Sequence, residues 1–468
     1  MKKILILVAF FFSLNTSAQF IKEKAPTETE LKINNAKQLG ELLKIAQTAK
    51  AKKDYKNLIS TLKKIVALKP YTPLFRYQLA EAFALNDNKT ESFNELIAIQ
   101  KQGFYFDIGN NTNLANINTY PVFKYIKENM EANNQHFGEG EEVFNINKSF
   151  SGLLFESLVY DPTGPAFLMG SLRDGRIIKI LDNGEVVTFI PPAKGGKTGP
   201  WATIDMSVDA DNDTLWVSSA AISQFGKLNK ESTGRAGVFK YQLSTGKLLK
   251  SYLIPDNKRP SLLSSIVHTA KGDVYFIDSV KNVVLRIAKD SDDINLAFTT
   301  KKYKNLRNIT ADETGNILYL SDEDEGVVIL NLQNQDIYIL PNTETLNLTG
   351  ISDLIYDDNA LIIFQNEIKP ERIMRLALNK SKFVIENIFP IESGNPLFNT
   401  LTKGTVVDQG LVTIANSQSV NANAYGGLLA GKAWENMVLL ISPKHYKEQE
   451  TLEYNKKIAA QKQKTGSK

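Results

Sequence analysis

The pattern of hydrophobic and polar positions divides the chain into two parts. Residues 28–133 place Leu, Ile and Ala at helical spacing among many Lys and Glu residues and carry few strand signals. After about residue 140, short runs of β-branched and aromatic residues alternate with Asp-Gly, Asn-Gly and Lys-Gly turns. The sequence therefore predicts a multidomain α + all-β chain, in which a helical region precedes a region of strands.

The helical part shows an internal repeat. The segment DYKNLISTLKKIVALKP (residues 54–70) resembles the second helix of a tetratricopeptide repeat, and a shift of about 34 residues superposes Ala46 on Ala80 and Leu62 on Leu96. Small residues at such positions let paired helices approach closely. The resemblance implies tetratricopeptide-like repeats over 28–133, with a plain helical bundle as the alternative. Their surface either binds a protein or peptide partner or packs on the next domain.

The strand-rich part also repeats. An apolar strand, a turn, an aromatic-rich strand and a further strand recur six times, starting near Phe155, Thr203, Leu263, Arg307, Gly350 and Thr402. This spacing suits four-stranded blades and predicts a six-bladed β-propeller over 141–442, with a two-sheet sandwich as the alternative. The last copy shows only three strands. We expect residues 141–150 to close blade six as its outer strand, which removes an open edge.

The first blade carries a family resemblance. FESLVYDPTG (155–164) and GRIIKILDNGEVV (175–187) are similar to the first blade of the regucalcin/gluconolactonase family, also called the senescence marker protein family. Its members are six-bladed propellers, and many hydrolyse lactones or esters with a divalent metal in the central channel. Paraoxonases share this architecture. The stretch 215–256 also resembles the Yellow and royal-jelly proteins, which are related propellers whose roles are more often binding.

The resemblance implies a cation site built from oxygen ligands at the channel ends of the innermost strands. Glu156 matches the Glu that blade one supplies in the family. Strand alignment then leads to Ile204, Ser264, Arg307 and Lys403, a register in which Arg307 or Lys403 replaces the metal by an ion pair.

A second register lies one residue further along. It surrounds Ca²⁺, or another divalent cation, with Glu156, Asp205, Asn308 and Asp353, and makes Asp205 or Asp353 the general base for hydrolysis. A one-residue slip turns a side chain to the other face of a strand, so the two registers exclude one another on a regular strand. Both stay open at the level of the sequence.

Two long loops mark the face on which a ligand would bind. Residues 220–237 and 416–435 join the second and third strands of blades two and six, and we expect them to converge above Glu156. Together with the linker PPAKGGKTGP they supply aromatic and basic candidates for contact with a small-molecule ligand at the propeller mouth: Trp201, Phe225, Arg235, Tyr425 and Trp434. His268 lies inside a strand and is predicted to be a packed core histidine.

Composition narrows the chemistry. The chain has no Cys and three His, which excludes disulfides, thiolate metal sites and Cys nucleophiles and leaves channel carboxylates as the main candidates. The formal net charge of +4 is too small to indicate a nucleic-acid partner. The two ends of the chain together contribute +6, more than the whole net charge. Lys2 and Lys3 contribute +2, and seven Lys against three Glu in the tail 444–468 contribute +4, which leaves −2 for the body.

The N-terminus predicts export. MKKILILVAFFFSLNTSAQ has a basic start, an apolar run over 4–14 and small residues before Gln19, which are typical of a signal peptide at 1–18. The apolar run is shorter than the roughly 20 residues that a membrane span needs, so no integral span is expected. The sequence thus predicts an exported, periplasmic or secreted bacterial propeller. Two functions stay open: a divalent-metal-dependent hydrolase of a lactone or small ester, and a non-catalytic scaffold that binds a ligand or a protein.

Overall fold

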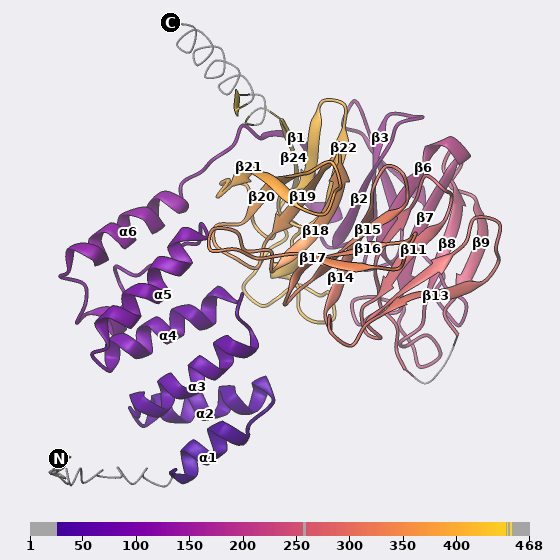
Figure 1. Ribbon diagram of the computed structural model, residues 1–468. Coiled ribbons are helices and arrows are strands. Elements are labelled where there is room, and N and C mark those ends of the chain that lie inside the picture. The colour runs from indigo at the N-terminus through magenta and orange to yellow at the C-terminus, as the bar shows by residue number, and fades with distance from the viewer. Residues whose placement is uncertain (1–25, 256–258, 446, 448–449, 452–468) are drawn as a thin grey trace, which may run out of the picture.

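The computed structural model describes residues 26–255, 259–445, 447, 450 and 451 of the 468. The predicted signal peptide at 1–18 lies outside the described residues, as does most of the tail 444–468. The described part contains a helical region followed by six four-stranded antiparallel sheets arranged as the blades of a propeller (Figure 1). The predicted α + all-β fold with a six-bladed β-propeller is confirmed.

The helical region consists of consecutive helices. They are α1 (Glu28–Asn35), α2 (Leu39–Ala51), α3 (Tyr55–Leu68), α4 (Pro73–Leu85), α5 (Lys89–Lys101) and α6 (Pro121–Asn133). Of these, α2 to α6 pack on their neighbours along the chain and α1 packs on α3. Local sequence sets their starts: Thr27 and Glu30 form a capping box at α1, the Asp54 side chain caps α3, and Pro73 and Pro121 open α4 and α6. Their relation to the tetratricopeptide family stays a prediction.

The propeller blades follow one another along the chain. Blade one holds β2 (Phe155–Asp161), β3 (Ala166–Ser171), β4 (Ile177–Leu181) and β5 (Val186–Ile190), and blade two holds β6 (Ala202–Asp209), β7 (Thr214–Ala220), β8 (Ala236–Gln242) and β9 (Leu248–Leu253). Blade three holds β10 (Leu263–His268), β11 (Val274–Asp278), β12 (Val283–Ile287) and β13 (Ile294–Thr299). Blade four holds β14 (Leu306–Ala311), β15 (Ile317–Asp322), β16 (Gly326–Asn331) and β17 (Ile337–Leu340). Blade five holds β18 (Ile351–Asp357), β19 (Ala360–Gln365), β20 (Arg372–Leu378) and β21 (Ile385–Ser393).

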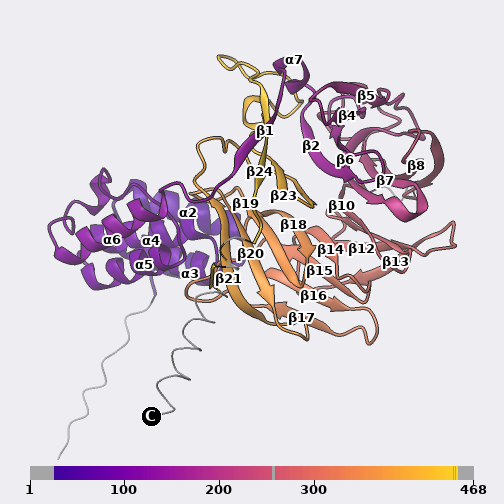
Figure 2. The same ribbon diagram turned by 90° about the horizontal axis from the view of Figure 1, so that it is seen from above.

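Blade six is assembled from both ends of the propeller. Its inner strands are β22 (Gly404–Val407), β23 (Gly410–Ile414) and β24 (Met437–Ser442), and its outer strand is β1 (Glu141–Ile146), which pairs antiparallel with β24 (Figure 2). The side chain of Ile146 is buried in a cluster with Phe155 and Met437, between blades six and one. Pairing the first strand with the last leaves neither end of the module as an open edge.

The helical region lies against blade five, beside β20 and β21 (Figures 1 and 2). Ile368, in the loop between β19 and β20, is buried in the helical core with Phe104 and Met130. The Tyr105 amide donates to the Lys369 carbonyl at 2.8 Å, so main chain as well as side chains joins the two parts. None of the helices in the described residues is long and apolar enough to cross a membrane.

The closing strand provides a stability test. Replacing the buried Ile146 by Ala should lower the free energy of unfolding by about 2–4 kcal/mol, because it removes packing between blades six and one. Val143 on the same strand is 37% exposed, and Val143→Ala should cost less than about 0.5 kcal/mol. Urea unfolding of both variants measures the difference. Equal effects would mean that β1 does not hold the ring together.

Candidate functional site

The innermost strands of blades one to five share one irregularity near their starts. The pairing register with the second strand shifts between Phe155 and Ser157 in β2, and at the corresponding place in β6, β10, β14 and β18. Such a β-bulge inserts an extra residue and breaks the alternation of side chains. The extra residues are Glu156, Ile204, Ser264 and Ser352, and in β14 the shift spans Arg307 and Asn308.

Because of the bulges, residues of both predicted registers reach the same end of the channel. The extra residues line a cavity of about 450 Å³ at the end of the channel where the innermost strands begin. The residues that follow them, Asp205 and Asp353, lie buried behind this layer. Both registers therefore supply side chains to the same end of the channel. The assumption that one register excludes the other was wrong, because it required a regular strand at this point.

Lys403 occupies the centre of the second register. Its amine donates to Asp353 Oδ1 at 2.9 Å and to Asn308 Oδ1 at 3.3 Å, and lies 3.7 Å from Asp205 Oδ2. The four side chains come from blades six, five, four and two. They meet because the innermost strands converge on the propeller axis. A cation supplied by the chain thus lies where the predicted metal ligands converge.

The charges of Lys403 and the two aspartates shift the pKa values of Lys403 and Asp205. Burial alone would lower the pKa of Lys403, but the Asp205 and Asp353 carboxylates outweigh it and hold that pKa above its ordinary value. Burial raises the pKa of Asp205, which Lys403 opposes and the neighbouring Asp353 reinforces. Lys403 is therefore an ammonium group at neutral pH and is unsuited to act as an amine nucleophile.

These residues do not fit a bound divalent metal. An ammonium within 3.3 Å of two of the oxygens would repel a second cation at that point. In the described ranges, no set of three or more His, Cys, Asp or Glu side chains lies close enough to hold a metal ion. Glu156 in particular does not join Asp205 and Asp353, and its carboxyl group lies near Ser417 and Ser419 in the loop after β23.

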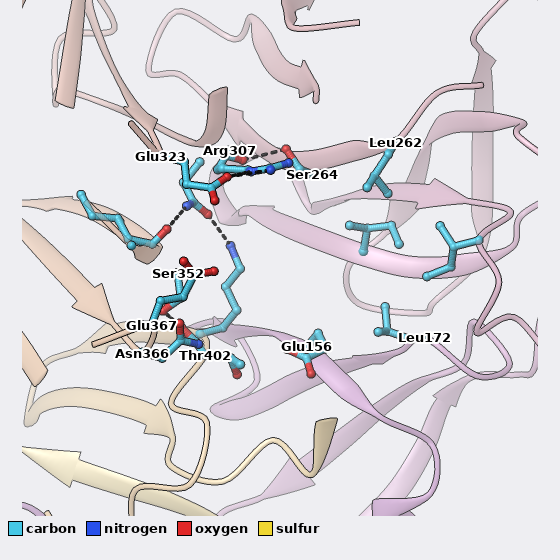
Figure 3. A pocket seen from close by; sticks show the side chains of 16 residues that line it. Glu156, Leu172, Leu262, Ser264, Arg307, Glu323, Ser352, Asn366, Glu367 and Thr402 are labelled. Atoms are coloured by element: carbon cyan, nitrogen blue, oxygen red, sulfur yellow. Dashed lines mark hydrogen bonds and ion pairs between the residues drawn. The ribbon is translucent and has the colours of Figure 1, made fainter. Parts of the chain in front are cut away.

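Arg307 lies elsewhere on the cavity wall. Its guanidinium pairs with Glu323, at 2.7 Å from Nη2 and 3.1 Å from Nε to Oε2, so it does not replace a metal between the buried carboxylates. Glu367 lies on the same side of the cavity, and partial burial with repulsion from Glu323 raises its pKa. Figure 3 shows Arg307, Glu323, Ser352 and Glu367 facing Leu172 and Leu262 across the cavity.

The cavity therefore has two unlike sides. Four aliphatic side chains from the first three blades and their loops form one wall: Leu172, Ile204, Ile222 and Leu262. Polar and charged side chains from blades four to six form most of the other: Arg307, Asn308, Glu323, Ser352, Asn366, Glu367, Thr402 and Lys403. Glu156 lies on the wall of blade one, where burial raises its pKa to about 7 against hydrogen bonds from Ser417 and Ser419 and the charge of Lys403.

The two long loops meet over blade one. Arg173, which follows β3, donates from Nη1 to the carbonyls of Gln224 (3.0 Å) and Tyr425 (2.5 Å), one in each loop. The Ser223 hydroxyl also donates to the Ala424 carbonyl at 2.8 Å. Arg173 was not among the residues predicted from the sequence. Its position two residues after the second strand of blade one was the available signal.

Of the residues expected to contact a ligand at the mouth, some are buried and others are exposed. Trp201 and Phe225 are each 1% exposed and pack in one hydrophobic cluster, so their expected role at the mouth is corrected to packing beneath the loops. Tyr425 is 73% exposed at the tip of its loop. Trp434 is partly exposed and lies over Gly152. Arg235 donates to the Glu231 carbonyl of its own loop.

His268 is held in the wall between blades two and three. Its Nδ1 lies 2.9 Å from the Ser207 hydroxyl, and burial lowers its pKa. This position fits a packed neutral histidine, which is what the sequence predicted.

The acidic side of the cavity was not predicted from the sequence. Glu323, Asn366 and Glu367 lie within two residues after the second strand of their blades, in SDEDEG and FQNEIK. In a propeller the end of the second strand lies beside the start of the first, so these positions also face the channel mouth. That placement was available from the strand pattern, but after the second strands only the long loops of blades two and six were proposed to face the mouth.

Comparisons with known proteins assign no family to this chain. No family model matches the chain, and no curated protein matches it. Two similar solved structures are a putative oxidoreductase (glucose dehydrogenase) from Thermus thermophilus and the PQQ-bound aldose sugar dehydrogenase of Streptomyces coelicolor. The first is 13% identical over 65% of this chain and 99% of that one (TM-score 0.43), and the second 11% identical over 66% and 99% (TM-score 0.42). A putative 6-phosphogluconolactonase from Bacteroides uniformis is 15% identical over 62% and 85% (TM-score 0.40). At these values the likeness carries no argument about activity.

The raised pKa of Glu156 predicts a pH effect on stability. The folded state keeps this proton up to about pH 7, whereas the ordinary value is 4.5, so wild-type stability should fall as the pH rises between these values. Glu156→Gln removes the titration. The melting temperature of Glu156→Gln minus that of the wild type should therefore increase between pH 5 and pH 8. The exposed Glu139→Gln serves as the control and should track the wild type throughout.

Proposed function

We propose that this chain is an exported, non-catalytic binding protein whose propeller cavity takes a small organic molecule without the help of a metal ion. The observation that carries the proposal is the Lys403 amine between Asp205, Asn308 and Asp353. A hydrolase of the gluconolactonase type needs a divalent cation there to polarise the substrate and activate water. Because Lys403 occupies the position of that cation, we assign the function to ligand binding in the cavity and not to metal-dependent catalysis.

The cavity walls favour a ligand with two different sides. Leu172, Ile204, Ile222 and Leu262 offer apolar surface that would be buried against the body of the ligand. The cavity lining and the buried layer beneath it hold five carboxyl groups, Glu156, Asp205, Glu323, Asp353 and Glu367, against two cations, Arg307 and Lys403. This excess of acceptors favours an ammonium group or several hydroxyl donors on the ligand.

Metal-dependent hydrolysis is the competing function. Its proposed general bases, Asp205 and Asp353, both accept hydrogen bonds from main-chain amides, at Ile266 and Gly404 respectively, and both lie against Lys403. Neither carboxylate is among the residues that line the cavity, where a substrate water would lie, so neither is placed to take a proton from that water. We therefore favour binding over lactone or ester hydrolysis.

The helical region offers a second hollow, separate from the propeller mouth. A pocket of about 320 Å³ lies between α2, α3 and α4 and is lined by Leu43, Ala46, Leu58, Leu62 and Ala82, among others. A protein or peptide partner at this surface stays a prediction. So does delivery to the periplasm or the medium by the leader 1–18.

Divalent cations provide the first test. Titration of the purified wild-type chain with Ca²⁺ or Mn²⁺ up to about 5 mM should leave its melting temperature unchanged within about 1 °C, because a ligand raises it only by binding the folded state. Lactone and ester substrates should show no hydrolysis above the rate without protein. A clear rise in melting temperature together with turnover would contradict the proposal and restore the hydrolase.

Ligand class provides the second test. A panel of small amines with aromatic or branched aliphatic bodies should raise the melting temperature, whereas the matched carboxylic acids with the same bodies should not. Ser264→Phe fills the cavity wall at a partly exposed position and should weaken binding at least about tenfold. Ser251→Phe on the outer strand β9 is the control and should bind like the wild type. Equal shifts for amines and acids, or for both variants, would place binding elsewhere.

A further inference from the structure

We infer that Lys403 does for this propeller what a bound metal ion would do, and that its side chain is what keeps Asp205, Asn308 and Asp353 from binding a divalent cation. The buried cluster is separate from the ligand site of the cavity above it. Its oxygen ligands are still in place, and a side chain fills the position of the cation.

The oxygens of the cluster are held in place by groups other than Lys403. Asp353 Oδ2 accepts from the Gly404 amide at 3.0 Å. Asp205 Oδ2 accepts from the Ser265 hydroxyl at 2.9 Å and from the Ile266 amide at 3.1 Å. Removing the lysine side chain leaves these bonds untouched, so both carboxylates should keep their positions.

The amide of Asn308 is oriented in the same way. Its Nδ2 donates to the Ser321 hydroxyl and to the Ile351 carbonyl, both at 3.0 Å, which fixes Oδ1 as the atom facing Lys403. Two carboxylates and one amide oxygen therefore converge on a single point from blades two, four and five. Oxygen ligands of this kind are those that Ca²⁺ prefers.

The charge balance explains why the point must hold a cation. Asp205 and Asp353 are both buried, with 7% and 6% exposure, and Lys403 supplies a positive charge between them. Without it, two like charges would face one another in a medium of low dielectric, which is strongly unfavourable. A bound dication would restore the balance.

The site is also accessible from the cavity. Lys403 and Asn308 line its floor, so an ion could enter from above and complete its shell of about six to eight oxygens with water. Shortening Lys403 to Ala opens the space that the chain of the lysine fills. Replacing it by Met keeps that space filled with apolar atoms and provides the matched control.

The experiment compares Lys403→Ala, Lys403→Met and the wild type in the full-length chain. In EDTA both variants should melt about 5–10 °C below the wild type, because each leaves the buried carboxylates uncompensated. With about 5 mM CaCl₂ the melting temperature of Lys403→Ala should rise by at least about 3 °C, while Lys403→Met and the wild type should not respond. Isothermal titration of Lys403→Ala should give one Ca²⁺ per chain.

A triple variant identifies the site. Lys403→Ala combined with Asp205→Asn and Asp353→Asn should lose the response to Ca²⁺, since both carboxylate ligands are gone. If Lys403→Ala does not fold alone, refolding from urea with CaCl₂ or with EDTA makes soluble yield the readout. The inference is overturned if Lys403→Ala melts within about 2 °C of the wild type, if it binds no Ca²⁺, or if Lys403→Met responds equally. These outcomes leave ligand binding by the wild-type cavity untouched, so the two proposals fail separately.

Discussion

The buried ammonium of Lys403 is the contact on which the centre of this propeller depends. Six innermost strands begin around one axis, and polar side chains from several of them meet there in a largely buried position, where unpaired charge is costly. Lys403 from blade six joins Asp205, Asn308 and Asp353, which come from blades two, four and five respectively. Hydrogen bonds continue from this centre to neighbouring strands, through Asp205 to Ser265 and through Asn308 to the Ile351 carbonyl. The axis is thus closed by a polar network with a charge at its middle.

The bulges at the strand starts make this arrangement possible. Each inserts a residue that lines the cavity, such as Glu156 or Ser352, and lets the next residue be buried behind it. One strand position can then serve the structure while its neighbour faces a ligand. The cavity lining and the carboxylates of the buried ion pair are therefore formed by adjacent residues of the same strands. The cavity therefore has an acidic wall, and beneath it the buried carboxylates are paired with Lys403.

The helical region is fixed beside the polar wall of the cavity. The Tyr71 carbonyl, between α3 and α4, accepts from Asn347 at 2.8 Å and from Thr349 at 3.0 Å, and the segment that holds these two donors runs directly into the cavity-lining residues 350 and 351. Arg372 donates from Nη1 to the Gln102 carbonyl at 2.9 Å and lies over the Phe104 ring. These contacts bury polar groups with partners across the two parts. The helices thus support the strand start that borders the cavity.

The sequence by itself determined the fold class, because helical spacing and period-two strands are local patterns and the blade repeats six times. It also identified Glu156, Asp205, Asn308, Asp353 and Lys403 as channel residues, since each lies at the start of an innermost strand. The tertiary structure alone decided what they do together. Pairing between strands created the bulges that admit both registers, and convergence of four blades brought Lys403 to the carboxylates. Trp201 and Phe225 were misplaced for the same reason: burial of a side chain depends on packing partners distant in sequence, which a local pattern does not contain.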